Sequence, residues 1–377
     1  MSDTGIYVHW PYCGAICPYC DFNVYRARGA DNAPVIDAIE ADLEAHAQRL
    51  GRREVVSLFL GGGTPSLLYG EEIERLIGAA SRSFRLAADC EITLECNPED
   101  AHLFAEHAVA GVNRFSVGAQ AFDDASLRAL GRKHDAAASL GAVEAAAKTG
   151  KRVSLDLIYA REGQSVEDWR TELRQALTLP IEHASLYQLT IEPGTAFARR
   201  VDRRQLTPPG DELSAGLYEA TQEVCDAAGF PAYEISNHAR AYAARSRHNA
   251  LYWRSDDWIG VGPGAHGRLT HEGARIATEA QHRPADYIKA VKESGLGWRS
   301  EARLTPKEAA DEVLLMGLRV EEGVERARVE ALRGSPLDGE ALAWLLAQNL
   351  VAQKNGRICL TRSGRLLSNR IVAELAS

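Results

Sequence analysis

The hydrophobic and polar positions in the first half of the chain follow two alternating periods. Short runs rich in β-branched and aromatic residues are separated by longer stretches in which apolar residues recur every three to four positions. This order is typical of βα units arranged around a parallel sheet. Six strands are predicted, at Ile6–Trp10, Val55–Leu60, Glu91–Glu95, Arg114–Val117, Val153–Ile158 and Ala184–Leu189.

The clearest helical pattern runs from about Asn32 to Leu50, with acidic residues between the apolar ones. Asn32 is expected to cap this helix, and Pro34 suits its first turn. Six βα units are too few to close an eight-stranded barrel. We therefore expect an α/β fold in which residues 1–190 form an open partial (βα)6 barrel. Its ligands should lie beyond the carboxyl ends of the strands.

The second half of the chain predicts two further parts. Segments rich in Pro and Gly indicate an irregular extension of the barrel over residues 191–300. Residues 301–377 predict two or three helices and then a hairpin that turns at Asn355 and Gly356, which resembles a winged-helix α+β domain. The basic residues there form no dense stripe, so nucleic acid is not expected as a partner.

Composition sets broad limits on the location and partners of the protein. The chain has 377 residues, of which 45% are hydrophobic, enough for a large core in two or three domains. Seven cysteines in a chain of this length do not indicate a disulfide framework. Without a signal-peptide pattern or an apolar run of bilayer length, a cytoplasmic location is expected. The net charge of −9 argues against unspecific binding to nucleic acid or anionic lipid.

Three cysteines near the start of the chain are the strongest chemical signal. Cys13, Cys17 and Cys20 form CxxxCxxC, and Phe22 stands where a further cysteine would follow. Iron–sulfur clusters are normally held by four cysteines, so one iron would lack a protein ligand. The spacing is that of radical S-adenosylmethionine (SAM) enzymes, in which three cysteines hold a 4Fe-4S cluster and SAM binds the remaining iron. A small zinc site or an accidental grouping of cysteines is the alternative.

Glycines and polar residues at predicted strand ends indicate a ligand pocket. Three glycines follow the second strand in Phe59–Ser66, where backbone N–H groups can approach a polar ligand. Glu95, Gln120 and Asp156 each emerge from an apolar run, and such side chains would be costly in a sealed core. The alternative for the glycines is a tight turn between strand and helix. The alternative for the polar residues is that other groups of the protein satisfy their hydrogen bonds.

The motifs together resemble one family. They are YVHWPYCGAICPYCDF, LGGGTP, GVNRFSVGAQAFDD, LGRKH, SLDLIY and SLYQLTIEPGT. They are similar to those of the oxygen-independent coproporphyrinogen III oxidases and of their relatives, the HemW haem chaperones. The resemblance implies that SAM contacts Tyr7, Tyr19, Gly62, Gly63, Thr64, Glu95, Gln120, Arg132 and Asp156.

Two features favour the chaperone branch of that family. The oxidases resemble CxxxCxxCxC, whereas this chain has CxF at the same position. The chaperones carry HNxxYW, which occurs here as His248, Asn249, Tyr252 and Trp253. Since imidazole is a haem-iron ligand, the resemblance implies haem contact at this motif, with His248 as the hypothetical axial ligand. His266 is a second candidate.

The loop after Asp156 departs from the family pattern. Ala160 and Arg161 stand where relatives have a Gly-Leu-Pro turn, so this loop should differ in shape.

The resulting hypothesis is a haem chaperone that binds a 4Fe-4S cluster, SAM and haem. It would pass haem to an acceptor protein, such as a membrane-bound respiratory protein, and take electrons from a flavodoxin or ferredoxin. No catalytic residue is assigned. The alternative is an oxygen-independent coproporphyrinogen III oxidase, which decarboxylates its substrate oxidatively to protoporphyrinogen IX. A winged-helix regulator that senses haem or redox state is a third possibility.

Overall fold

The computed structural model describes residues 3–376, and its centre is one curved sheet of eleven strands. Seven neighbouring strands run parallel, and six of them confirm the six predicted from the sequence. The sheet does not close on itself, so the fold is the open partial barrel expected. The six predicted strands are β1 (Thr4–Trp10), β4 (Glu54–Gly62), β5 (Arg85–Cys96), β6 (Arg114–Gln120), β7 (Arg152–Tyr159) and β8 (His183–Gln188).

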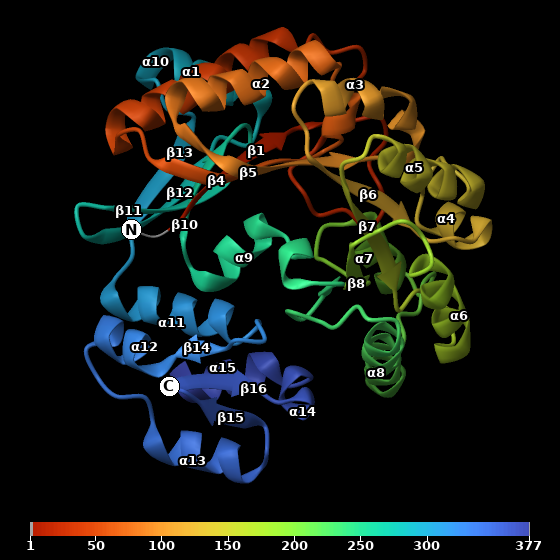
Figure 1. Ribbon diagram of the computed structural model, residues 1–377, viewed down its shortest axis with the longest axis vertical. Helices are drawn as coiled ribbons and strands as arrows, with labels where there is room; N and C mark the ends of the chain where they lie inside the picture. Colours follow the sequence, from red (N-terminus) through yellow and green to blue (C-terminus); the bar gives the residue numbers. More distant parts are fainter. Residues whose placement is uncertain (1–2, 377) are drawn as a thin grey trace.

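Amphipathic helices cover the outer face of this sheet (Figure 1). In the first of them, the apolar residues Val35, Ile36 and Ile39 are almost completely buried, which explains the helical spacing in the sequence. The helices outside the sheet include α1 (Ala33–Leu50), α2 (Gly70–Ser83), α3 (Phe104–Val109), α4 (Asp124–Ala129), α5 (Ala136–Lys148), α6 (Val166–Ala176), α8 (Asp211–Ala227) and α10 (Pro284–Ser294).

The predicted cap of α1 is wrong. Asn32 already has helical backbone angles, and its side chain makes no capping bond. Its amide donates instead to Glu72 on α2, 3.0 Å away. The side chain of Asp31 accepts the N–H of Ala33 at 3.0 Å. Asn32 therefore stands at the N-cap position without capping the helix through its side chain, which joins α1 to α2 instead.

Residues 191–300 lengthen the sheet at both edges. At one edge β10 (Asp257–Val261) pairs in parallel with β1, and three antiparallel strands follow. At the other edge β9 (Asn237–Ala239) pairs antiparallel with β8. The division of the chain at residues 190 and 300 stays a prediction. The outer strands are β11 (His266–His271), β12 (Ala274–Ala280) and β13 (Trp298–Arg303).

One helix lies on the inner side of the curved sheet. Figure 1 shows α9 (Arg247–Arg254) within the curve, where it contacts β1, β4 and β10. It follows the short 3-10 turn η3 (Tyr242–Ala244), and the side chain of Ser246 caps its first turn. At its other end, Arg328 donates to the carbonyl of Arg254 at 2.8 Å. This helix carries the HNxxYW motif.

The C-terminal domain has its own hydrophobic core and a three-stranded sheet. Its hairpin turns at Asn355 and Gly356 as predicted. Both residues have positive φ, at 51° and 76°, as a two-residue hairpin turn of this kind requires. Its elements are α11 (Pro306–Gly317), β14 (Val324–Glu325), α12 (Arg326–Arg333), α13 (Gly339–Ala347), β15 (Val351–Lys354), β16 (Arg357–Leu360), α14 (Arg362–Arg365) and α15 (Ser368–Ala376).

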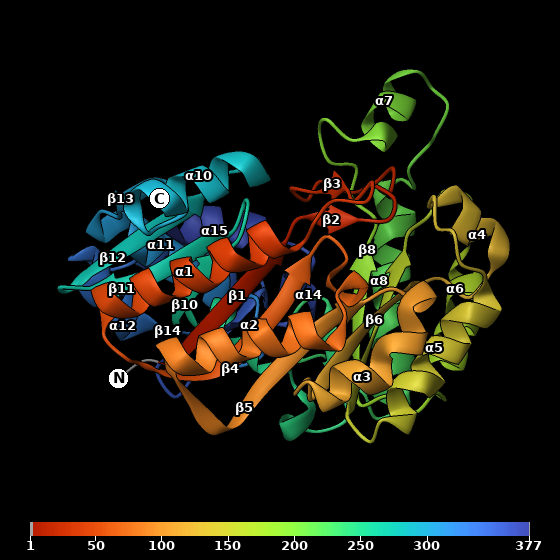
Figure 2. The ribbon, with the colours of Figure 1, turned by 90° about the horizontal axis from the view of Figure 1, so that it is seen from above.

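The cysteine-containing loop lies beyond the carboxyl ends of the parallel strands. Figure 2 shows its short strands β2 (Tyr12–Cys13) and β3 (Tyr25–Arg26) at this edge, with α7 (Ala196–Asp202) further out. The N–H of Phe197 on α7 donates to the carbonyl of Pro18 in the loop at 2.9 Å. Within residues 3–376 the helices are all too short or too polar to cross a bilayer.

Candidate functional site

The three motif cysteines lie in one ordered loop and line one cavity. Cys13 ends β2, and the N–H of Cys20 donates to the carbonyl of Cys17 at 3.1 Å in a tight turn. The N–H of Ala27 donates to the carbonyl of Cys13 at 2.9 Å, which closes the loop. All three thiols are free and border the same cavity, beside the exposed ring of Phe22.

Two of the three thiols, those of Cys13 and Cys20, are protonated before any metal binds. Burial raises the pKa of Cys13, and it raises the pKa of Cys20 to about 11. Iron must therefore displace these protons, since the thiolate is the metal ligand. The guanidinium of Arg132 donates to the sulfur of Cys17 at 3.4 Å and places a positive charge at the cavity wall.

These thiols fit a multi-iron cluster better than a single ion. Across residues 3–376, no three His, Cys, Asp or Glu side chains are grouped so that they could hold one metal ion. In a cubane cluster each thiolate binds a different iron, so the thiols need not converge on one point. The donor set of three free thiols around one cavity is chemically suited to such a cluster.

The glycines after β4 fasten the cysteine loop to the sheet. Gly62 has a φ of 103°, and a Cβ there would lie 2.6 Å from the ring of His9. A Cβ on Gly63 would lie 2.6 Å from the carbonyl oxygen of Tyr12. The N–H of Gly63 donates to the carbonyl of Trp10, at the end of β1, at 2.7 Å, and the N–H of Thr64 donates to the carbonyl of Tyr12 in the loop at 2.8 Å. These N–H groups therefore hold the start of the loop, where the sequence analysis expected them to face a ligand.

Two carboxyl groups in the cavity wall have no basic partner among the described residues. Burial, with the nearby charge of Asp156, raises the pKa of Glu95 to about 8. Burial also raises the pKa of Asp156 to about 6, although Ser116 donates to this carboxylate at 2.9 Å. The N–H of Gly62 donates to Glu95 at 3.0 Å. A cationic ligand in the cavity would supply the missing positive charge.

Gln120 reaches the cavity because its strand is distorted. The register of β6 against β7 shifts between Val117 and Gln120, and Gln120 has a φ of 68°. A left-handed conformation is uncommon for a residue other than glycine, and such strain is concentrated at functional sites. The distortion directs the amide of Gln120 toward the other polar groups of the cavity.

The structure brings together every predicted SAM residue except Tyr7. The residues that line the cavity with the cysteines are Tyr19, Gly62, Gly63, Thr64, Glu95, Gln120, Arg132 and Asp156. The hydroxyl of Tyr7 bonds instead to Nδ1 of His9, at 3.0 Å, and its ring faces Phe59 and His248.

Sequence analysis missed several further residues that line this cavity, among them the polar or small residues Asn97, Ser116 and Gly118. Alternate residues of a strand point to the same face, so the spacing of Ser116 and Gly118 from Gln120 was an available signal. Asn97 follows Glu95 by the same interval, and its side-chain oxygen accepts a bond from Arg132.

His248 of the HNxxYW motif points into the partial barrel. It is 1% exposed and stacks on Phe59 with 4.9 Å between ring centroids. Its two ring nitrogens bond to the hydroxyls of Ser57, at 2.9 Å, and Tyr252, at 2.7 Å. Burial lowers its pKa to about 3, so the imidazole is neutral. Its role as an axial haem ligand stays a prediction, and in this arrangement both nitrogens already have partners.

The other predicted haem residues occupy different environments. The N–H of Asn249 donates to the capping hydroxyl of Ser246 at 3.2 Å. Tyr252 packs edge-on against Trp258, and Trp253 is half-buried. His266 is exposed at the start of β11. The motif residues therefore do not share one surface, and their contact with haem stays a prediction.

The unusual loop after Asp156 keeps a glycine-like turn. Ala160 has a φ of 60°, in the left-handed region that favours glycine. Arg161 is buried, and its guanidinium pairs with Glu172 at 2.5 Å. Arg161 therefore stabilises the loop and does not line the cavity of the cysteines.

Comparisons with known proteins agree with this geometry. Residues 7–176 match the model of the Radical SAM superfamily, and residues 304–367 match that of the HemN C-terminal domain. A protein of Bacillus subtilis described as "Heme chaperone HemW" is 33% identical over 374 residues, which covers 97% of each chain. The chain belongs to the HemW family.

A second relative and a solved structure extend the comparison. The protein of Danio rerio described as "Radical S-adenosyl methionine domain-containing protein 1, mitochondrial" is 39% identical over 329 residues, covering 85% of this chain and 74% of the relative. The structure of coproporphyrinogen III oxidase (HemN) from Escherichia coli matches with a TM-score of 0.82 at 22% identity. That match covers 100% of this chain and 90% of the other. It confirms the expected fold.

Proposed function

We propose that this HemW-family protein is a haem chaperone on a radical SAM scaffold, which binds haem and transfers it to an acceptor protein. The observation that carries the proposal is the match to a HemW haem chaperone over 97% of both chains. The cavity at the carboxyl edge of the sheet supports the radical SAM part. It gathers three free thiols and two carboxyl groups that have no basic partner within residues 3–376.

Cys13, Cys17 and Cys20 would each bind one iron of a 4Fe-4S cluster, which supplies an electron to the sulfonium of SAM when both are bound. Phe22 offers no ligand for the remaining iron, so that iron stays open to SAM. Glu95 and Asp156 would accept hydrogen bonds from the ammonium and ribose hydroxyls of SAM. The cation would also favour the ionised form of Glu95.

The proposal includes two kinds of protein partner and a location. A flavodoxin or ferredoxin would reduce the cluster, and a respiratory protein would accept the haem. We place this transfer in the cytoplasm. Helix α9, which carries the HNxxYW motif, is the proposed haem-contacting element. Its two faces offer different chemistry to a porphyrin, and His248 lies on the face that is now buried.

The test uses protein reconstituted with iron and sulfide without oxygen. One sample is titrated with haem and then mixed with a haem-free acceptor, and haem in each protein is followed by absorption after separation. A parallel sample receives coproporphyrinogen III, SAM and a reductant. Haem binding and transfer, without a vinyl product, are expected. Failure to bind haem would contradict the chaperone proposal.

The rival function is an oxygen-independent coproporphyrinogen III oxidase. The fold shared with HemN over the whole chain favours it. Phe22 in place of the further cysteine, together with the HNxxYW motif, argues against it. Formation of protoporphyrinogen IX in the parallel sample would replace the chaperone proposal with this one.

A further inference from the structure

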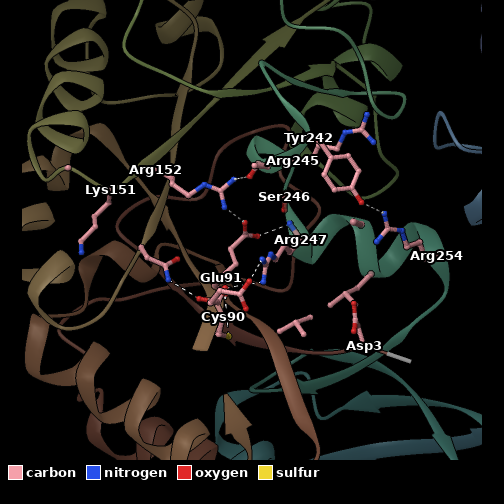
Figure 3. A pocket seen from close by; sticks show the side chains of 17 residues that line it. Asp3, Cys90, Glu91, Lys151, Arg152, Tyr242, Arg245, Ser246, Arg247 and Arg254 are labelled. Atoms are coloured by element: carbon pink, nitrogen blue, oxygen red, sulfur yellow. Dashed lines mark hydrogen bonds and ion pairs between the residues drawn. The ribbon is translucent and has the colours of Figure 1, made fainter. Parts of the chain in front are cut away.

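A second cavity lies at the opposite end of the partial barrel, near the amino ends of the strands (Figure 3). Its volume is about 800 Å3, within the range of small-molecule sites. Its walls come from the residue before β1, the middle of β5, the start of β7, from η3 and from α9. It shares no lining residue with the cavity of the cysteines.

Helix α9 presents different faces to the two ends of the barrel. His248 and Tyr252, four residues apart, point into the barrel beside Phe59. Ala250 and Leu251 line the second cavity together with Val56 of β4, and they give it an apolar floor. The regular repeat of the helix thus points the buried imidazole of the motif away from the open cavity.

The second cavity is positively charged although the chain as a whole is acidic. Five basic side chains line it against three carboxylates, a surplus of two positive charges in a chain with a net charge of −9. The basic residues are Lys151, Arg152, Arg245, Arg247 and Arg254, and the acidic ones are Asp3, Asp89 and Glu91.

Most of these cations already have partners, but Lys151 does not. Arg152 pairs with Glu91 at 3.0 Å, and Arg247 pairs with Asp89. The ammonium of Lys151 makes no ion pair or hydrogen bond with any residue that the structure describes, and Figure 3 shows it on the side of the cavity away from Arg254. An anionic group of a ligand could approach Lys151 without breaking an existing pair.

Tyr242 offers an iron ligand at the other side of the cavity. Its side chain is 69% exposed, and Arg254 donates to its phenol oxygen at 3.3 Å. The guanidinium of Arg245 lies 4.9 Å from the centre of its ring. Phenolate oxygen is a known axial ligand of haem iron, and a neighbouring guanidinium would balance its charge.

Other iron ligands are absent from the described lining of this cavity or unsuited to the role. No histidine is among the lining residues. Cys90 is 6% exposed, and burial raises its pKa to about 12, so it remains a thiol. Tyr242 is therefore the side chain with both exposure and suitable chemistry.

We propose that the second cavity binds haem, with the macrocycle against Ala250 and Leu251, a propionate at Lys151, and the phenol oxygen of Tyr242 on ferric iron. The phenol releases its proton to solvent as the iron–oxygen bond forms. This inference rests on the proposed haem-chaperone function and assigns the haem to the side of α9 that lines the second cavity, leaving His248 in its buried place.

The test compares the haem affinity and the ferric spectrum of four variants in the full-length protein. Lys151→Glu should weaken haem binding about tenfold, because it places a negative charge beside a propionate. Tyr242→Phe should remove the phenolate-to-iron charge-transfer band and change the ferric electron paramagnetic resonance signal. Ala250→Trp should abolish binding by filling the cavity. Lys292→Glu, with the same charge change at an exposed position on α10, should bind as the unaltered protein does.

Folding is checked by thermal unfolding and by cluster incorporation at the other end of the barrel. If Ala250→Trp does not fold, the exposed positions Lys151 and Tyr242 still decide the result. Unchanged haem binding and spectra in both of those variants would overturn this site but leave the chaperone proposal standing. A further variant, His248→Ala, is measured alongside these four. Loss of binding in this variant alone would move the site into the barrel. An unaltered protein that binds no haem would contradict the chaperone proposal itself.

Discussion

The two ends of the partial barrel differ in whether their buried carboxylates are paired with cations. Glu91 and Glu95 lie four residues apart on the same strand, β5. At the amino end, Glu91 accepts bonds from Arg114 and Arg152, both at 3.0 Å, and from the N–H of Arg247 at 2.8 Å. At the carboxyl end, Glu95 accepts a single backbone bond, and no cation pairs with it among the described residues.

This difference separates a structural carboxylate from one that is available to a ligand. A buried charge that is fully paired holds elements together, and Glu91 joins strand β5 to β6, β7 and α9. A buried carboxyl without a cation is costly unless a ligand completes it, and such groups are concentrated at functional sites. Asp257 repeats the structural pattern, because Arg53 and Arg275 both pair with it at the start of β10.

The largest expected effect is loss of the cluster at the carboxyl end. Replacement of Cys13, Cys17 or Cys20 by Ala should in each case abolish incorporation of iron and sulfide. The loop provides three thiolates, and a cluster that is normally held by four needs all of them. Iron content and the visible absorption of reconstituted protein measure this. Cys225→Ala, a buried cysteine on α8, is the control and should keep a full cluster. Full clusters in any of the three loop variants would contradict the assignment.

The next effect concerns stability at the amino end. Glu91→Gln should lower the free energy of unfolding by about 3–5 kcal/mol, because it leaves buried cations uncompensated. Urea denaturation measures the change. Glu95→Gln is the matched control on the same strand, and it should not destabilise the protein, because it removes no ion pair, while it should weaken SAM binding. Equal destabilisation in the two variants would contradict the distinction between a paired structural carboxylate and an unpaired one.

The pH dependence of stability sharpens the same contrast. The pKa of Glu95 is about 8 in the folded protein, against about 4.3 for an unfolded glutamate. Between these values the folded state holds more protons than the unfolded state, so the contribution of Glu95 to stability falls as pH rises. Asp156, with a pKa of about 6, acts in the same direction over a lower range.

Denaturation of the metal-free protein at several pH values between about 4 and 8 tests this sign. Glu95→Gln should flatten the decline of the free energy of unfolding with rising pH, because the amide that replaces the carboxyl does not titrate. A decline that is equally steep in the variant would show that Glu95 is ionised throughout.

The smallest expected effect is a gain in stability from Ala160→Gly. Ala160 holds a left-handed conformation that glycine adopts without strain, and the gain should be about 1 kcal/mol or less after the entropy cost of glycine. The midpoint of urea denaturation measures it. Ala147→Gly, at a half-buried position within α5, should instead destabilise the protein. Destabilisation at both positions would contradict the strain at Ala160.

Local patterns in the sequence predict the carboxyl end of this molecule well. The six central strands follow from runs of β-branched residues, and the ends of parallel strands meet at one edge, so Glu95, Gln120 and Asp156 could be grouped in advance. The cysteine motif is confined to eight residues and needs no tertiary information. The capping role of Asn32 was wrong because its amide has a partner, Glu72, on another helix.

The inner helix and the amino end depend on contacts between distant parts of the chain. The burial of His248 rests on Ser57, 191 residues away, and no local pattern predicts that contact. Strand β10 was not predicted because its position beside β1 brings together residues from opposite ends of the barrel. Tyr242 and Lys151 face one cavity only because η3 and the start of β7 meet there.

The backbone bonds from Gly63 to Trp10 and from Thr64 to Tyr12 have a consequence for how iron is acquired. They tie the start of the cysteine loop to strand β4 through groups that no metal can displace. The loop is consequently ordered before iron arrives, and assembly need not bear the entropic cost of arranging the thiols. A cluster lost to oxygen should therefore be rebuilt on an intact frame, without refolding of the barrel.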